Sequence, residues 1–244
     1  MNYALLIETT SVGFALGLVE RKLAAPELRW YSVYSDRFGA AQYLADHLAD
    51  GIRKLGITPD AIKEVVVGTG PGSFTGIKIG VSFATGFYAL QNGTRFYSVS
   101  SLEMYLGSIN RKTQDSSKRG IAIKATKAHG FCALLESNNL TSFAFNVDDK
   151  GHEIFSANEL ASVGSWDELK INSKKHGVVC NEILPEDYLV EVLKGMTEFL
   201  GCSGENEAMD EPPAPNYMKM STAEERILNG YEAFHCPDLY QKIL

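Results

Sequence analysis

The sequence lacks long apolar runs, and none approaches the roughly 18 residues that a membrane-spanning helix needs. The opening segment, residues 1–8, also lacks the basic start of a signal peptide and soon carries a carboxylate, Glu8. These absences exclude a membrane-spanning protein, and we expect a soluble protein of the cytoplasm.

Cysteine and histidine are scarce and scattered. The four cysteines, at positions 132, 180, 202 and 236, include no C-x-x-C pair. The five histidines include no i,i+4 pair of the kind that binds zinc on a helix. We therefore expect free thiols rather than disulfides in a reducing compartment, and no metal site.

Basic charge is also in short supply. The chain has 23 basic and 30 acidic residues and a formal net charge of −7. A protein that binds nucleic acid by itself presents a basic surface. The basic clusters here are only pairs, at 111–112, 118–119 and 174–175. We therefore expect any contact with RNA to be made through another molecule.

The chain does contain clear strand and helix patterns. Three short apolar segments, followed by a helical pattern in which apolar residues recur every three or four positions, predict an antiparallel meander and then a helix. The expected strands are 4–9, 14–19, 28–34, 65–67, 95–99, 120–125, 130–136 and 140–147, and the expected helices are 41–55, 74–90, one opened by Ser100 or Ser101, and 186–200.

This alternation predicts an α/β protein with two mixed lobes that join near residue 105. We divide the chain into an N-terminal lobe (1–105), a divergent C-terminal lobe (106–213) and a C-terminal segment (214–244). The segment 214–244 is expected to pack back on the first lobe. Three prolines and several acidic residues make 201–215 a loop.

A glycine-rich turn, GTGPGS, links the fourth strand to the second helix. Proline followed by glycine suits the centre of a type II turn, and the serine is placed to cap the helix. Such a turn can also bind phosphate, but neither G-x-x-x-x-G-K-[ST] nor G-x-G-x-x-G is present. The turn residues are Gly68, Gly70, Pro71, Gly72 and Ser73.

The helix 74–90 contains three glycines and a single charge, Lys78. Each helical glycine costs about 1 kcal/mol relative to alanine, which favours a close approach of another backbone. Small and apolar residues cover more than half of the helix circumference, so we expect it to pack on its own sheet and on a second surface, either the second lobe or another chain. The expected interface residues are Phe74, Gly76, Ile77, Gly80, Phe83, Ala84 and Phe87.

Residues 68–80, GTGPGSFTGIKIG, resemble the hallmark motif of the bacterial TsaB (YeaZ) family, with Lys78 in place of an arginine. Residues 6–11, 99–103 and 215–219 add to the resemblance, which is strong over 1–105 and thin beyond. It implies two actin-like (ASKHA, RNase H-like) lobes, each a mixed sheet with flanking helices. The older peptidase M22-like naming finds no support, because neither a metal-binding histidine pair nor a Ser/His/Asp arrangement is recognisable in the sequence.

The resemblance also implies a role in threonylcarbamoyladenosine modification of tRNA. A TsaD-like paralogue would carry the catalytic site, and a TsaE-like ATPase would join the assembly. This chain would be a non-catalytic scaffold that docks on the TsaD-like enzyme and activates it, pairs with itself, or does both, and would touch tRNA only indirectly. The resemblance further implies that no cofactor is held tightly by this chain, and that ATP or ADP with Mg binds only at the junction with partners.

The chain departs from the family pattern at three points. Glu8 stands for the usual aspartate, Lys124 for the aspartate of Asp-Ala-Arg, and Gly39 for a histidine. Two alternatives stay open. One is an actin-like ATPase or phosphotransferase that uses Glu8, Thr9 and Thr10 with the glycine-rich turn to contact the nucleotide. The other is a homodimeric adaptor with no tRNA role.

Overall fold

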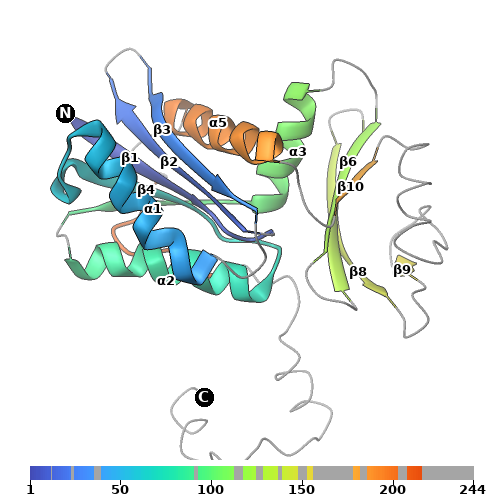
Figure 1. Ribbon diagram of the computed structural model, residues 1–244. Helices are drawn as coiled ribbons and strands as arrows, with labels where there is room; N and C mark the ends of the chain where they lie inside the picture. The colour runs from blue at the N-terminus through green and yellow to red at the C-terminus, as the bar shows by residue number, and fades with distance from the viewer. Residues whose placement is uncertain are drawn as a thin grey trace, which may run out of the picture.

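The computed structural model contains two five-stranded sheets joined by a helix (Figure 1). The residues that the structure describes are 1–11, 13–22, 25–35, 40–90, 93–112, 118–124, 129–136, 139–147, 153–155, 178–181, 186–202 and 208–215. Side-chain positions are described mainly for the first sheet and for the helices that cover it.

The first sheet has the strand order β3-β2-β1-β4-β5. The strands are β1 (Asn2–Glu8), β2 (Phe14–Arg21), β3 (Glu27–Tyr34), β4 (Ile62–Gly68) and β5 (Arg95–Val99). β1, β2 and β3 form the predicted antiparallel meander, because short turns join them. β4 and β5 run parallel to β1, because each is reached through a helical crossover.

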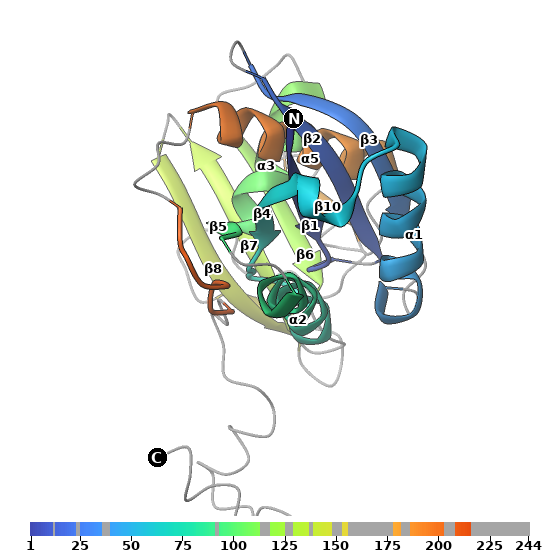
Figure 2. The ribbon, with the colours of Figure 1, turned by 90° about the vertical axis from the view of Figure 1, so that its left-hand side faces the viewer.

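Helices cover both faces of this sheet (Figures 1 and 2). α1 (Ala40–Leu55) and α2 (Phe74–Leu90) lie on one face, and a short 3-10 helix, η1 (Pro59–Ala61), leads from α1 into β4. α3 (Ser101–Lys112) and α5 (Glu186–Cys202) lie on the other face. Side chains alternate along β1, so that Leu5 and Ile7 join the core under α1 and α2, whereas Ala4 and Leu6 join the core under α3 and α5.

The second sheet has the order β10-β6-β7-β8-β9. Its strands are β6 (Lys118–Lys124), β7 (His129–Glu136), β8 (Asn139–Val147), β9 (Glu153–Phe155) and β10 (Val178–Asn181). β6 to β9 form an antiparallel meander, and β10 pairs parallel to β6. α3 contacts β6 and β7, so this helix connects the first sheet to the second.

The predicted elements are confirmed where the structure describes them, with ends that differ by only a few residues. The domain boundaries stay a prediction, but two segments beyond residue 105 pack against the first sheet. α5 buries its apolar side chains in the core formed with β1 and β2. Phe96 and Met209 exchange two backbone hydrogen bonds of 2.8 Å at the edge of β5. The predicted packing of 214–244 falls almost wholly outside the described residues.

Among the described residues, no helix is both long and apolar enough to cross a membrane.

Candidate functional site around the end of β1 and helix α2

The carboxylate of Glu8 is completely buried at the end of β1. Its Oε1 accepts hydrogen bonds from the backbone N–H and the hydroxyl of Thr10, both at 2.6 Å. Its Oε2 accepts a hydrogen bond of 2.9 Å from the hydroxyl of Ser101, the first residue of α3. The carboxylate therefore ties the end of β1 to the helix that leads to the second sheet.

Gly68 makes room for this carboxylate. A Cβ atom at position 68 would stand 2.0 Å from Glu8 Oε2, closer than any real contact. Burial raises the pKa of the Glu8 carboxyl, and the hydrogen bonds from Thr10 and Ser101 offset part of that rise. Gly68, the first glycine of the turn, is therefore needed to leave space for the buried Glu8 carboxylate.

Two further contacts hold α3 at the same place. Ser101 and Gly70 are joined twice: Ser101 N–H donates to the Gly70 carbonyl at 2.9 Å, and Gly70 N–H donates to Ser101 Oγ at 3.2 Å. The hydroxyl of Tyr105 donates to Ser11 Oγ at 2.8 Å. Burial, and next the nearby charge of Glu8, raise the pKa of Tyr105 well above its ordinary value, so it stays a neutral donor.

The N–H groups of the glycine-rich turn point into the protein. Thr69 N–H donates to the Val99 carbonyl, Ser73 N–H donates to the Thr10 carbonyl, and Gly76 N–H donates to Ser73 Oγ. Ser73 therefore caps α2 as predicted. The predicted type II turn is wrong. It requires a positive φ at Gly72, whereas the glycine with a positive φ is Gly70, at +108°. Because these donors are engaged, fewer N–H groups of the turn remain for a phosphate.

Gly76 and Gly80 let α2 pack closely against the segment that follows β1. A Cβ at Gly76 would lie 2.0 Å from the Thr9 carbonyl oxygen, and one at Gly80 would lie 2.4 Å from Thr9 Oγ1. The hydroxyl of Thr9 donates to the Gly76 carbonyl at 2.7 Å. Ile77 and Ala84 are buried on the same side of the helix.

The opposite side of α2 is exposed and almost uncharged. Lys78 is its only charge, and its ammonium lies over the Phe74 ring, 4.2 Å from the centroid. Gly86 has no heavy atom within 4 Å of a Cβ position, so nothing in the described part of the chain explains this third glycine. Tyr88 and Leu90 are 45% and 86% exposed. Other exposed residues of this face are Thr75, Ser82, Thr85 and Ala89. Ile79, Phe83 and Phe87 are half-buried and pack against the core under α1 and α2.

The burial of several α2 residues corrects the set of interface residues that the sequence predicted. Gly76, Ile77, Gly80 and Ala84 are buried inside the chain and pack on its own first sheet, so they cannot line an external contact. The half-buried Phe74, Phe83 and Phe87 remain accessible from outside. The interface itself stays a prediction, and it now concerns the exposed side of α2.

A buried ionic cluster at the other end of the sheet escaped the sequence analysis. The side chain of Glu64, only 3% exposed, pairs with Arg21 at 2.7 Å and with Arg95 at 2.7 Å, and accepts a hydrogen bond from Tyr97 at 3.2 Å. Arg21 also donates to the carbonyl of Leu200 near the end of α5. One signal could have revealed it: Glu64 directly precedes the buried apolar run 65–67 within the same strand.

Other predicted features are only partly visible. Cys202 is a free and exposed thiol, whereas the other three cysteines lie where side chains are not described. Gly39 and the side chain of Lys124 also lie outside the described part. Within the described residues, no three His, Cys, Asp or Glu side chains come together as a metal site would require.

The sheet order and the helices on both faces of the first sheet define the chain as a mixed α/β protein. Residues 41–156, which include α2 and the glycine-rich turn, match the family model of TsaD, tRNA N6-adenosine threonylcarbamoyltransferase. No curated protein matches the chain by sequence.

Two solved structures share the fold. YeaZ from Pseudomonas aeruginosa superposes with a TM-score of 0.59 and 18% identity, over 89% of this chain and 100% of that one. An uncharacterized protein with similarity to peptidase YeaZ from Pseudomonas aeruginosa gives a TM-score of 0.60 and 19% identity, over 90% of this chain and 100% of that one. The matched residues relate this part of the chain to a tRNA-modification family, and the two structures show that the chain shares the YeaZ fold.

Proposed function

We propose that this chain is a non-catalytic partner subunit that binds and activates a TsaD-like enzyme in threonylcarbamoyladenosine modification of tRNA. One observation carries the proposal: the exposed side of α2, rich in small and apolar residues, bears a single charge. Such a surface favours burial against another chain, because little polar desolvation opposes it.

The exposed side of α2 also has a composition that suits helix packing. Ser82, Gly86 and Ala89 are small and exposed, and they follow one another at intervals of four and three residues. Phe83 and Phe87, with ring centroids 6.0 Å apart, are half-buried against the core of the first sheet and lie nearer the buried side of the helix. Small residues let a second backbone approach, and aromatic residues are typical anchors of an interface.

The end of β1 supports a non-catalytic role. A general base must reach substrate or a metal-bound water, but the Glu8 carboxylate is buried and already accepts three hydrogen bonds from the chain. Thr9 and Thr10 are buried as well. In this proposal ATP or ADP with Mg binds only where this chain meets its partners, a TsaD-like enzyme and a TsaE-like ATPase in the cytoplasm.

Co-purification with the TsaD-like paralogue of the same cells tests the proposal. Ser82→Arg and Gly86→Arg place a long charged side chain on the exposed side of α2 without touching its buried side. We expect either substitution to abolish co-purification while the thermal unfolding of the chain stays cooperative. Thr58→Arg is the matched control, since Thr58 is exposed, lies outside α2 and makes no side-chain capping bond.

Complex formation that survives both α2 substitutions would refute this surface as the contact. A homodimeric adaptor is the second candidate, because the same uncharged surface suits self-pairing. Sedimentation of the isolated chain distinguishes them. An adaptor forms a dimer that Gly86→Arg dissociates, and its deletion leaves the threonylcarbamoyladenosine content of tRNA unchanged.

A further inference from the structure

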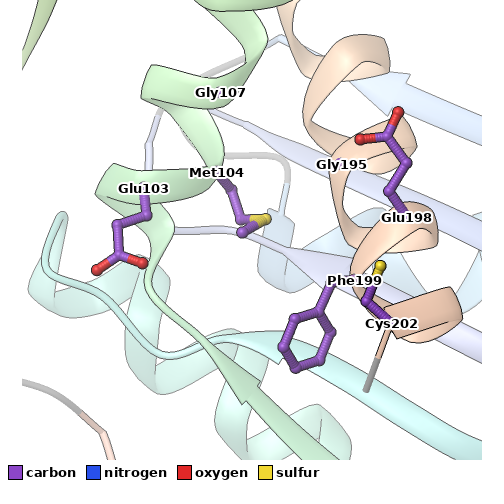
Figure 3. A pocket seen from close by; sticks show the side chains of 7 residues that line it. All are labelled: Glu103, Met104, Gly107, Gly195, Glu198, Phe199 and Cys202. Carbon is purple, nitrogen blue, oxygen red and sulfur yellow. The ribbon is translucent and has the colours of Figure 1, made fainter. Parts of the chain in front are cut away.

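A pocket of about 260 Å³ lies between α3 and α5, on the opposite face of the first sheet from α2 (Figures 1 and 3). Met104 of α3 and Phe199 of α5 extend toward the gap between the two helices (Figure 3). The seven lining residues are Glu103, Met104, Gly107, Gly195, Glu198, Phe199 and Cys202.

The size of the pocket restricts what can occupy it. Sites for drug-sized molecules and cofactors usually measure about 300–1,000 Å³, so this one is small for such a ligand. A single apolar side chain inserted from a partner is the size that it suits. Phe199 provides a fixed apolar wall, because its ring also packs edge-on against Tyr97, with centroids 6.1 Å apart. Met104 provides an adaptable one.

The charge of the pocket restricts the occupant further. Glu103 and Glu198 carry exposed carboxylates on opposite sides, and none of the seven lining residues is basic. In Figure 3 both carboxylates point away from the apolar gap, so they flank it rather than fill it. This arrangement disfavours the phosphates of a nucleic acid and complements basic groups on either side of an apolar one.

We infer that the α3/α5 pocket is a second docking site, and that its occupant is a peptide segment of another protein in which Lys or Arg residues flank an apolar side chain. The apolar side chain enters between Met104 and Phe199, and the basic groups pair with Glu103 and Glu198. Because α2 lies on the other face of the sheet, this contact leaves the exposed side of α2 accessible to a different partner (Figure 2). The inference does not depend on the function proposed above.

Cys202 makes the inference testable with defined probes. It is an exposed free thiol that lines the pocket, so disulfide exchange can trap weak binders there. The full chain is equilibrated with three peptides, Cys-Lys-Leu-Arg, Cys-Glu-Leu-Glu and Cys-Lys-Gly-Arg, each supplied as its mixed disulfide with 2-mercaptoethanol, under partly reducing conditions. The Cys202 thiolate attacks the peptide sulfur and releases 2-mercaptoethanol. Peptide mapping by mass spectrometry then gives the occupancy of Cys202 apart from the other cysteines.

We expect the basic leucine peptide to occupy Cys202 at least about threefold more than either of the other two peptides. Because 1.4 kcal/mol corresponds to a tenfold preference, this threefold preference corresponds to somewhat under about 1 kcal/mol. The glycine peptide separates an apolar site from simple attraction of charge. Glu103→Gln with Glu198→Gln should remove the preference over the acidic peptide. Asp46→Asn with Asp60→Asn, an equal change of charge at exposed positions on other elements, should leave it intact.

Three outcomes would each overturn the docking site. Equal capture of the leucine and glycine peptides would show that the pocket binds no apolar side chain. A preference that survives the double glutamine variant would show that the carboxylates do not select the occupant. Stronger capture of the acidic peptide would favour an anionic partner instead.

Discussion

The carboxylate of Glu8 accepts a hydrogen bond from the hydroxyl of Ser101 across 93 positions of sequence, with a distance of 2.9 Å between the two oxygens. Glu8 ends β1 and Ser101 begins α3, the helix that contacts the second sheet. The next residue, Thr9, donates to Gly76 of α2. The end of β1 therefore contacts both the helix of the proposed interface and the helix that connects the two sheets.

The buried carboxylate makes stability depend on pH in a specific direction. Because burial raises the pKa of Glu8 above its ordinary 4.5, the folded state binds this proton more tightly than the unfolded state. The stabilisation is complete below pH 4.5 and is lost as the pH rises through the raised value. Glu8→Gln should lack this loss, so the difference in unfolding free energy between variant and wild type grows in favour of the variant as the pH rises. Urea unfolding between pH 4 and 8 measures it.

Glu27→Gln is the matched control for the pH experiment. Hydrogen bonds from Lys22 and Arg29 lower the pKa of Glu27, so its contribution is present above pH 4.5 and is lost as the pH falls. The two variants should therefore differ from wild type in opposite pH ranges. Parallel curves for Glu8→Gln and wild type at every pH would show that Glu8 titrates as it does in the unfolded chain.

The two kinds of glycine in α2 should respond oppositely to alanine. Gly80→Ala brings a Cβ within 2.4 Å of Thr9 Oγ1, and overpacking of this kind costs about 1–3 kcal/mol. Gly86→Ala meets nothing and should stabilise the chain by about 1 kcal/mol through helix propensity. Midpoints of urea unfolding compare the two variants directly. Equal effects would mean that α2 does not lie on Thr9 as described.

The ionic cluster around Glu64 should matter far more than the ion pairs on the surface. Glu64→Ala leaves Arg21 without its buried partner, and breaking a buried pair costs about 3–5 kcal/mol at full burial. Since the arginines are partly exposed, we expect about 2–3 kcal/mol here. Glu27→Ala removes a half-exposed carboxylate that water screens, and should cost much less. Thermal unfolding should rank the two variants in this order, and the reverse order would contradict the role of the cluster.

The isolated chain should not bind Mg-ATP with micromolar affinity. The oxygens of Glu8 and the N–H groups of Thr69, Gly70 and Ser73 in the glycine-rich turn are already engaged within the chain. Isothermal calorimetry at concentrations of about 50 μM detects such affinities readily. A micromolar signal that Glu8→Gln abolishes would instead support the ATPase alternative.

Local sequence patterns predicted the elements of the first sheet well. The short apolar segments 4–9 and 14–19 and the three- and four-residue spacing in 41–55 are properties of neighbouring residues, so they can be recognised without a structure. The capping role of Ser73 is equally local. The motif of residues 68–80 pointed to the family whose fold the chain shares.

Only the tertiary structure shows which residues contact the glycines of α2 and the carboxylate of Glu8. The glycines of α2 predicted a close approach, but only the fold shows that Gly76 and Gly80 face Thr9, some 67 residues earlier, whereas Gly86 faces outward. One alternative made Glu8 a nucleotide contact, whereas the structure encloses its carboxylate with Gly68 and Ser101. The physical reason is the same in each case. These contacts join segments far apart in sequence, and helical or strand periodicity carries no information about partners at such separations.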